Sequence, residues 1–276
     1  MSRLETRFAA LREEGRGGLV TFITAGDPNA DISAEILAGL PAAGADVIEL
    51  GMPFTDPMAD GPSIELASGR ALAAGQNMAK TLSMVSDFRK SDGDTPIVLM
   101  GYYNPIHAYG RDRFAKDAAA GGVDGLILVD LPPEEEDEFR PQAVAAGIDI
   151  VRLIAPTSTD ARIATLVENA SGFVYYVSVR GITGTSSAAA GDIASNVGRI
   201  RAQTDLPVAV GFGIRTPEQA AEVAAVADAS VVGTAIVEKI ANAVDADGNA
   251  SPHLVSDTLS FVSDLAAAVS AARTKS

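Results

Sequence analysis

Residues 46–62 read Asp-Val-Ile-Glu-Leu-Gly-Met-Pro-Phe-Thr-Asp-Pro-Met-Ala-Asp-Gly-Pro, an apolar strand followed by a loop rich in proline. The strand carries one carboxylate, Glu49, and a second one, Asp60, lies near the end of the loop. Because side chains alternate along a strand, we expect Glu49 to point away from the face that Ile48 and Leu50 share. If both faces are buried, an unpaired ionised carboxylate costs on the order of several kcal/mol. Glu49 is therefore either half of a structural ion pair or a residue kept for its chemistry.

Short runs rich in Val, Ile and Leu recur along the chain and alternate with segments that have helical spacing of apolar residues. Eight runs are predicted to be strands: 18–24, 46–51, 96–102, 125–130, 148–154, 172–178, 207–212 and 229–233. Helices are predicted at 3–14, 31–43, 111–120, 134–146, 159–169, 217–227 and 253–272, with a further helical part inside 52–95 and another opening at 232–235. This alternation predicts an α/β fold, a single (β/α)8 TIM barrel with an extra N-terminal helix. We expect 1–276 to be one catalytic domain.

Composition narrows the class of protein. A length of 276 residues suits one α/β barrel, and 47% apolar residues allow a large core. No run reaches the roughly eighteen apolar residues of a membrane span, and the charged N-terminus differs from a signal peptide. The absence of cysteine excludes disulfides and thiolate catalysis. A net charge of −15 argues against nucleic acid and anionic membranes as partners. We expect a cytoplasmic protein.

The missing residue types limit the chemistry. A Schiff-base aldolase needs a lysine inside the barrel, whereas the lysines here fall on spacers, helices or the tail. The only histidines are His107 and His253, which excludes a histidine-rich metal site but leaves carboxylate-held magnesium open. The turn after the first strand, 24–28, lacks the glycine pattern of a dinucleotide site. General acid and base catalysis by Glu49 and Asp60 is the chemistry that the sequence favours.

Three glycine-rich segments follow the last three predicted strands, at 180–186, 211–217 and 232–235. In α/β barrels a phosphate is often held by the loops after the seventh and eighth strands and by the N-terminus of a short helix. Glycine lets backbone N–H groups approach the phosphate oxygens. The segments therefore favour a phosphate site, to which Arg180 and Arg215 could add positive charge.

The sequence allows two interpretations of several other residues near the predicted strand ends. Aromatic rings there either line a pocket for a flat apolar ligand or fill the core. Phe54 and Met58, in the loop before Asp60, either form an exposed lid or contact surface or fold back onto the barrel mouth. Two further acids, Asp27 and Asp130, are expected to be caps or loop anchors.

Seven stretches make the chain resemble the alpha subunit of tryptophan synthase along nearly its whole length: 22–28, 49–62, 100–105, 124–132, 155–158, 181–185 and 211–214. The resemblance implies a (β/α)8 barrel that cleaves indole-3-glycerol phosphate to indole and glyceraldehyde 3-phosphate. It implies no cofactor in this chain and a beta subunit that carries pyridoxal phosphate, in an alpha2-beta2 tetramer through which indole passes in a tunnel.

The same resemblance implies roles for individual residues. Glu49 would be the acid and base at the glycerol hydroxyl and at indole C3, and Asp60 would take or stabilise the indole N–H proton. Thr183 would help to position Asp60 from a closing loop. Three further groups are implied: Gly184, Gly213, Gly233 and Thr234 for the phosphate; Phe22, Met100, Tyr102, Ile127, Tyr175 and Phe212 for the indole; Phe54 and Asp56 for the beta subunit.

Some positions depart from the family pattern. Met100, Ile127 and Thr234 replace the commoner Leu, Leu and Ser, and these changes should keep the pocket apolar and the phosphate bound. Arg180 stands where many members have a small residue, so the sequence leaves open how the loop closes and how closure is coupled to a partner. Two alternatives stay open: another phosphate-binding barrel, either an isomerase or an indole-glycerol-phosphate-forming synthase, and a binding or scaffolding protein without catalysis.

Overall fold

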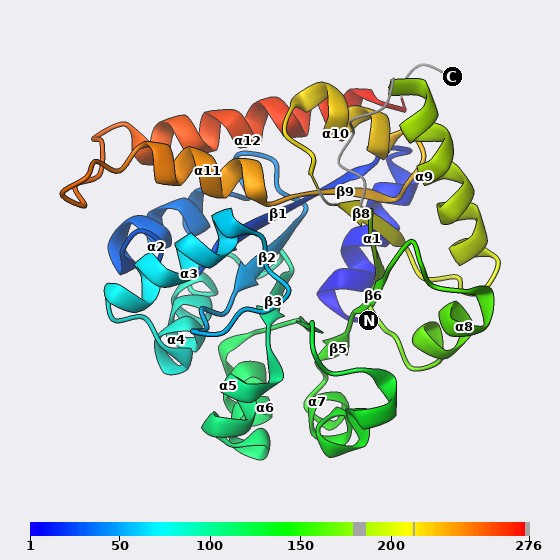
Figure 1. Cartoon of the computed structure of the whole chain (residues 1–276), viewed down its shortest axis with the longest axis horizontal. Coiled ribbons are helices and arrows are strands. Elements are labelled where there is room, and N and C mark those ends of the chain that lie inside the picture. The colour runs from blue at the N-terminus through cyan, green and yellow to red at the C-terminus, as the bar shows by residue number, and fades with distance from the viewer. Residues whose placement is uncertain (179–185, 212, 274–276) are drawn as a thin grey trace.

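The computed structural model describes residues 1–178, 186–211 and 213–273 (Figure 1). Nine parallel strands in these residues form one sheet in the order β5-β4-β3-β2-β1-β9-β8-β7-β6. They are β1 Gly18–Thr24, β2 Val47–Gly51, β3 Ile97–Gly101, β4 Gly125–Leu128, β5 Asp149–Ile150, β6 Arg152–Ile154, β7 Val174–Val177, β8 Val208–Gly211 and β9 Ala229–Val232. The strand predicted at 148–154 is divided at Val151, so that β5 pairs with β4 and β6 pairs with β7. The chain itself thus joins the two ends of the sheet, which confirms the barrel.

Helices surround the strands, as Figure 1 shows. They are α1 Arg3–Glu13, α2 Ala30–Gly39, α3 Pro62–Ala73, α4 Met78–Phe88, α5 Tyr103–Tyr109, α6 Arg111–Gly121, α7 Arg140–Ala145, α8 Asp160–Glu168, α9 Ser186–Arg201, α10 Pro217–Ala224, α11 Thr234–Asn242 and α12 Leu254–Ala271. The helix predicted at 134–146 is wrong in one respect: a 3-10 helix, η1 Pro133–Glu138, precedes α7. Pro141 explains the break, because proline has no N–H to continue a helix but fits the first turn of a new one.

The extra N-terminal helix α1 closes one end of the barrel. Its Leu4, Phe8 and Leu11 are buried in the same cluster as the inward-facing strand residues. The Phe8 and Phe173 ring centroids are 5.6 Å apart. This end holds the N-termini of the strands, so a ligand has access only from the opposite end, where the strands finish.

Strand alternation places the first carboxylate as expected. Ile48 and Leu50 pack in the cluster between the sheet and the outer helices. Glu49 lies on the other face of β2, within the barrel, and its backbone is in register with Phe22 of β1 and Val98 of β3.

Helix α12 has the length and hydropathy of a membrane span. It nevertheless contacts α10, α11, β1 and α2, and five of its residues are buried against them. The core helix of a soluble protein has these same properties, so the helix is weak evidence for a span.

Candidate active site

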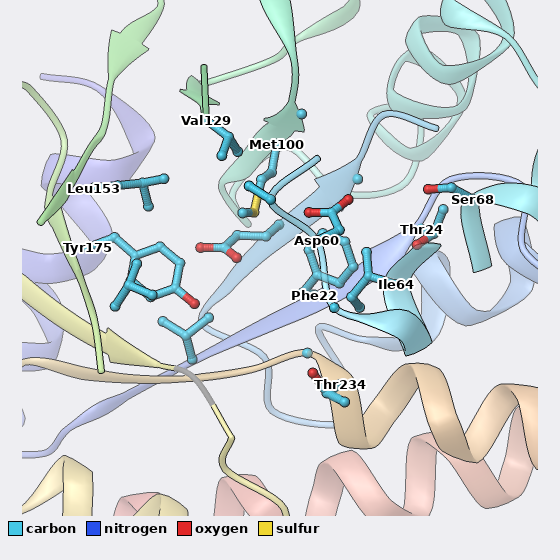
Figure 2. Close-up of a pocket in the computed structure, with 18 of the residues that line it drawn as sticks. Phe22, Thr24, Asp60, Ile64, Ser68, Met100, Val129, Leu153, Tyr175 and Thr234 are labelled. Carbon is cyan, nitrogen blue, oxygen red and sulfur yellow. The ribbon is translucent and has the colours of Figure 1, made fainter. Parts of the chain in front are cut away.

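A cavity of about 250 Å³ opens at the C-terminal ends of the strands (Figure 2). Among the described residues, its wall is mostly apolar and contains no lysine, histidine or cysteine. Tyr175 and Leu153 lie on the opposite side of the cavity from Thr24 and Ser68 in Figure 2. The wall is formed by Phe22, Thr24, Glu49, Gly51, Met52, Ala59, Asp60, Gly61, Ile64, Ser68, Met100, Gly101, Val129, Leu153, Tyr175, Val177, Gly213, Ile214, Val231, Gly233 and Thr234.

Glu49 is a deeply buried acid on the cavity wall. Its side chain lines the cavity, the residue is 1% exposed, and its Oε1 has no hydrogen-bond partner among the described residues. Burial raises the pKa of Glu49 to about 8, because the charged form is poorly solvated. Tyr175 is buried on the same cavity wall. Burial raises the pKa of its hydroxyl well above the ordinary value, and the negative charge of ionised Glu49 raises it further. Near neutral pH, Glu49 therefore holds a proton that it can give to a ligand in the cavity.

Asp60 lies half-buried at the end of the loop that follows β2. The preceding Ala59 N–H donates a hydrogen bond to the Tyr102 hydroxyl at 3.0 Å, and the Phe54 ring is 5.6 Å from the Tyr102 ring. Burial raises the pKa of Asp60, and nearby Glu65 adds to this, whereas a hydrogen bond from Tyr102 opposes it. Tyr102, placed in the ligand pocket by the resemblance, is not part of the described cavity wall. Its hydroxyl instead anchors the loop at Ala59, next to Asp60.

Backbone groups form another part of the cavity wall. Gly213 has φ +80°, a conformation that favours glycine. Gly233 precedes Thr234, the first residue of α11, and has no side-chain cap hydrogen bond. A Cβ on Gly233 would come 3.1 Å from the Cβ of Phe22. Free N–H groups at a helix N-terminus, next to glycines that permit close approach, suit an anion.

Arg215, expected near the phosphate site, forms an ion pair with another residue of the chain. Arg215 pairs with Glu238 of α11, and its Nη2 donates to Glu238 Oε1 at 3.0 Å. The second arginine, Arg180, lies outside the described residues.

The structure brings together most of the described residues predicted from the resemblance. Phe22, Met100 and Tyr175 line the cavity with the carboxylates and glycines, whereas Ile127 is fully buried in the inner core and does not. Three predicted residues, Thr183, Gly184 and Phe212, lie outside the described residues.

Sequence reasoning missed part of the wall. Val177 ends β7, Val129 directly follows β4 and Leu153 is one residue before the end of β6, positions that could have identified them. Ile64 and Ser68 come from α3, and no sequence signal marked that helix as part of the wall.

The expected loop anchors are confirmed. Asp27 is 1% exposed and accepts two hydrogen bonds from Arg70 of α3, at 2.7 and 2.9 Å. Asp130 accepts the Tyr103 N–H at 2.8 Å. On the rim, Phe54 folds back onto Tyr102, whereas Met58 is 86% exposed.

Asp56 is exposed on the rim and accepts a hydrogen bond from the Thr55 hydroxyl at 2.5 Å. In the described part of the chain, no group of three or more acids or histidines could hold a metal ion.

The chain is similar to known proteins over nearly its full length. The sequence model of the family described as tryptophan synthase alpha chain matches residues 8–267. The tryptophan synthase alpha chain of Granulibacter bethesdensis is 58% identical over 273 residues, which are 99% of this chain and 98% of that one. The crystal structure of tryptophan synthase subunit alpha from Legionella pneumophila is 39% identical with a TM-score of 0.88, covering 98% of both chains. A chain of M. tuberculosis tryptophan synthase in its aminoacrylate-bound form is 34% identical with a TM-score of 0.84, covering 98% of this chain and 100% of that one.

Proposed function

Because the chain belongs to the tryptophan synthase alpha chain family, we propose that Glu49 and Asp60 carry out the proton transfers of that family's reaction. The chain is the enzyme subunit that cleaves indole-3-glycerol phosphate to indole and glyceraldehyde 3-phosphate, a lyase reaction of tryptophan biosynthesis. It pairs with the beta subunit, which binds pyridoxal phosphate, and the alpha chain itself needs no cofactor.

Glu49 acts twice in this proposal. Its carboxylic acid gives a proton to C3 of the indole ring, which leaves positive charge on the ring nitrogen. Asp60 accepts a hydrogen bond from that nitrogen and stabilises the charge. The Glu49 carboxylate then takes the proton of the hydroxyl on the adjacent glycerol carbon. As the aldehyde forms, the electron pair of the breaking carbon–carbon bond returns to the ring, and Glu49 ends protonated as it began.

The observation that supports this assignment best is the isolation of Glu49. A buried carboxyl without a partner keeps its proton near neutral pH and becomes a strong base once it has given the proton away. The apolar wall favours an indole ring and keeps water out of the cavity. Gly213, Gly233 and Thr234 bind the phosphate through backbone N–H groups and the N-terminus of α11.

The rim of the cavity is the surface for the beta subunit. Met58 and Leu66 are 86% and 64% exposed, unusual values for large apolar side chains, and both lie close to Asp60 in the sequence. The assembly is an alpha2-beta2 tetramer in the cytoplasm, and residues 1–276 act as one catalytic domain. The place of the chain in a biosynthetic pathway supports the cytoplasmic location.

The test measures indole release from indole-3-glycerol phosphate by wild type and by Asp60→Asn. We expect Asp60→Asn to lower kcat by about a hundredfold, because charge on the ring nitrogen loses its counter-ion. Asp112→Asn, on the exposed first turn of α6, is the matched control and should keep the wild-type rate. Equal rates for the two variants would remove Asp60 from the mechanism.

The same assay tests the rim. Added beta subunit should raise the rate by ordering the loop that carries Asp60. Asp56→Ala should reduce this activation more than it reduces the rate of the isolated chain. Unchanged activation in Asp56→Ala would place the contact elsewhere.

A further inference from the structure

Glu238 of α11 joins three segments of the chain. Its Oε1 accepts a hydrogen bond from Ser63 Oγ of α3 at 2.9 Å and one from Arg215 Nη2 at 3.0 Å. The second nitrogen of the Arg215 fork, Nη1, pairs with Glu238 Oε2. Arg215 is thus held by both carboxylate oxygens, a geometry that fixes direction as well as distance.

The three segments all border the cavity. Helix α3 begins directly after Asp60 and Gly61 and contributes Ile64 to the wall. Arg215 follows Gly213 and Ile214, which line the wall, and α11 begins with Thr234. Glu238 therefore lies where the Asp60 segment meets the two segments of the proposed phosphate site.

The two sides of this junction have unequal support, although Tyr102 also anchors the Asp60 loop by accepting the Ala59 N–H. The backbone N–H of Arg215 donates to Gln219 Oε1 at 2.8 Å, and Thr216 caps α10 through its side chain, so the loop after β8 has other anchors. The N-cap of α3 is Gly61, which offers no side-chain cap. In the first turn of α3, Ser63 makes a side-chain hydrogen bond to another element, and its acceptor is Glu238.

The neighbours of Glu238 keep its carboxylate ionised. The hydrogen bond from Arg215 is the main reason that the pKa of Glu238 lies below its ordinary value, and the bond from Ser63 acts in the same direction. Glu238 is half-buried, so water screens the pair only in part. The carboxylate stays ionised across the range of neutral pH.

We propose that Glu238 is a positioning residue, which fixes the first turn of α3 through Ser63 and so holds Asp60 at the distance that the reaction needs. The inference rests on the proposed function, since it assigns to Glu238 an effect that passes through Asp60. Loss of the contact should affect the chemical step more than substrate binding, because the phosphate loop has anchors of its own.

The experiment measures kcat and KM for indole release in Ser63→Ala, Glu238→Ala and the double variant. Each single change should lower kcat by about five- to tenfold with KM within about twofold. The double variant should lose no more than the worse single variant, because both changes break the same contact. If the double variant instead lost kcat by the product of the two single losses, Ser63 and Glu238 would act independently, which would contradict the inference.

A second arm separates positioning from general loosening of the fold. In an Asp60→Asn background, Glu238→Ala should cause no further fall in kcat, because the residue that it positions is already disabled. A further fall of about fivefold in that background would overturn the inference while leaving the role of Asp60 intact. An Asp60→Asn variant with the wild-type rate would instead contradict the proposed function.

The matched control is the ion pair between Arg199 and Asp160, in which two guanidinium nitrogens reach one carboxylate oxygen at 2.9 and 2.7 Å. None of its residues lines the cavity. Asp160→Asn should leave kcat unchanged, and the melting temperatures of this variant and of Glu238→Ala should both stay within about 3 °C of wild type. A fall in kcat for Asp160→Asn equal to that for Glu238→Ala would also overturn the inference.

Discussion

Two deeply buried carboxylates at opposite ends of the barrel, Asp46 and Glu49, differ in their partners. At the N-terminal end, Asp46 is buried, accepts the Leu19 N–H at 2.8 Å and is bound by Arg16 through two hydrogen bonds at 2.8 and 2.9 Å. Asp124 repeats the arrangement with the Ile97 N–H and two arginines. At the C-terminal end, Glu49 is as deeply buried, but its Oε1 has no partner in the part of the chain that the structure describes.

The same backbone contact recurs at three strands of the N-terminal end. Asp46, Asp124 and Asp228 each come directly before a strand, and each accepts the N–H of a residue in the preceding neighbour strand. Arg3 and Arg7 of α1 bind Asp124 and Asp46, so the acids also fasten the helix that closes the barrel. Paired acids such as these, and Asp27 with Arg70 near the other end, thus stabilise the fold. Glu49, whose Oε1 has no partner among the described residues, is free for chemistry.

The largest effect should come from removing the unpaired acid. Glu49→Gln keeps the shape of the side chain but cannot transfer a proton, so kcat for indole release should fall by about 10²–10⁴-fold. Because Glu49 acts twice, the loss should lie toward the upper end of this range. A variant that kept more than about a tenth of the wild-type rate would contradict the assignment.

The same variant should be more stable than wild type in alkaline solution. In the folded chain the pKa of Glu49 is raised from 4.5 to about 8, so the folded state binds the proton more tightly than the unfolded state. Wild-type stability should therefore fall as pH rises from about 4.5 to about 8, by a few kcal/mol in total. Melting curves of both proteins across this range should diverge in favour of Glu49→Gln. Parallel curves would mean that Glu49 is ionised or well solvated.

Removing a paired acid should have the reverse outcome. Asp46→Ala leaves Arg16 and the buried Leu19 N–H without their acceptor, and should cost about 3 kcal/mol of unfolding free energy. Below its melting transition the variant should cleave substrate at the wild-type rate, because the cavity is at the other end. Denaturant unfolding together with kcat measures both. Unchanged stability with lost activity in Asp46→Ala would contradict a structural role for Asp46.

A smaller effect should come from adding an acid at the C-terminal end. Gly213→Asp places a negative charge in the proposed phosphate site and should weaken the binding of glycerol 3-phosphate by at least about tenfold. Gly248→Asp is the control, because Gly248 has the similar φ of +84° and a Cβ there meets nothing within 4 Å. Calorimetry that found equal affinity for both variants would place the phosphate elsewhere.

Much of the architecture followed from local sequence patterns. Alternation of apolar residues predicted the inward direction of Glu49, and the strand and helix order predicted the barrel. The break at Val151 was missed, because the apolar run continues through it and the cause is the change of partner from β4 to β7.

The site was only partly predictable for a related reason. Inward-facing strand residues, such as Phe22 of β1 and Tyr175 of β7, could be placed from topology alone. The contributions of Ser68 and Glu238 come from helices whose packing sets which side chains reach the cavity or its border, and no short sequence pattern records that. Tyr102 lies at a strand end as predicted, but tertiary contact with Ala59 directs it to the Asp60 loop.

The most direct test is the titration of Glu49 itself. Infrared difference spectra between wild type and Glu49→Gln, recorded from pH 4 to pH 10, isolate the carboxyl band of this one residue. We predict a protonated carboxyl at neutral pH that ionises with a midpoint at about pH 8. The rate of indole release should fall along the same curve, because the reaction begins with the protonated form. A carboxylate already ionised at pH 6, with a midpoint near the ordinary value of 4.5, would contradict the account.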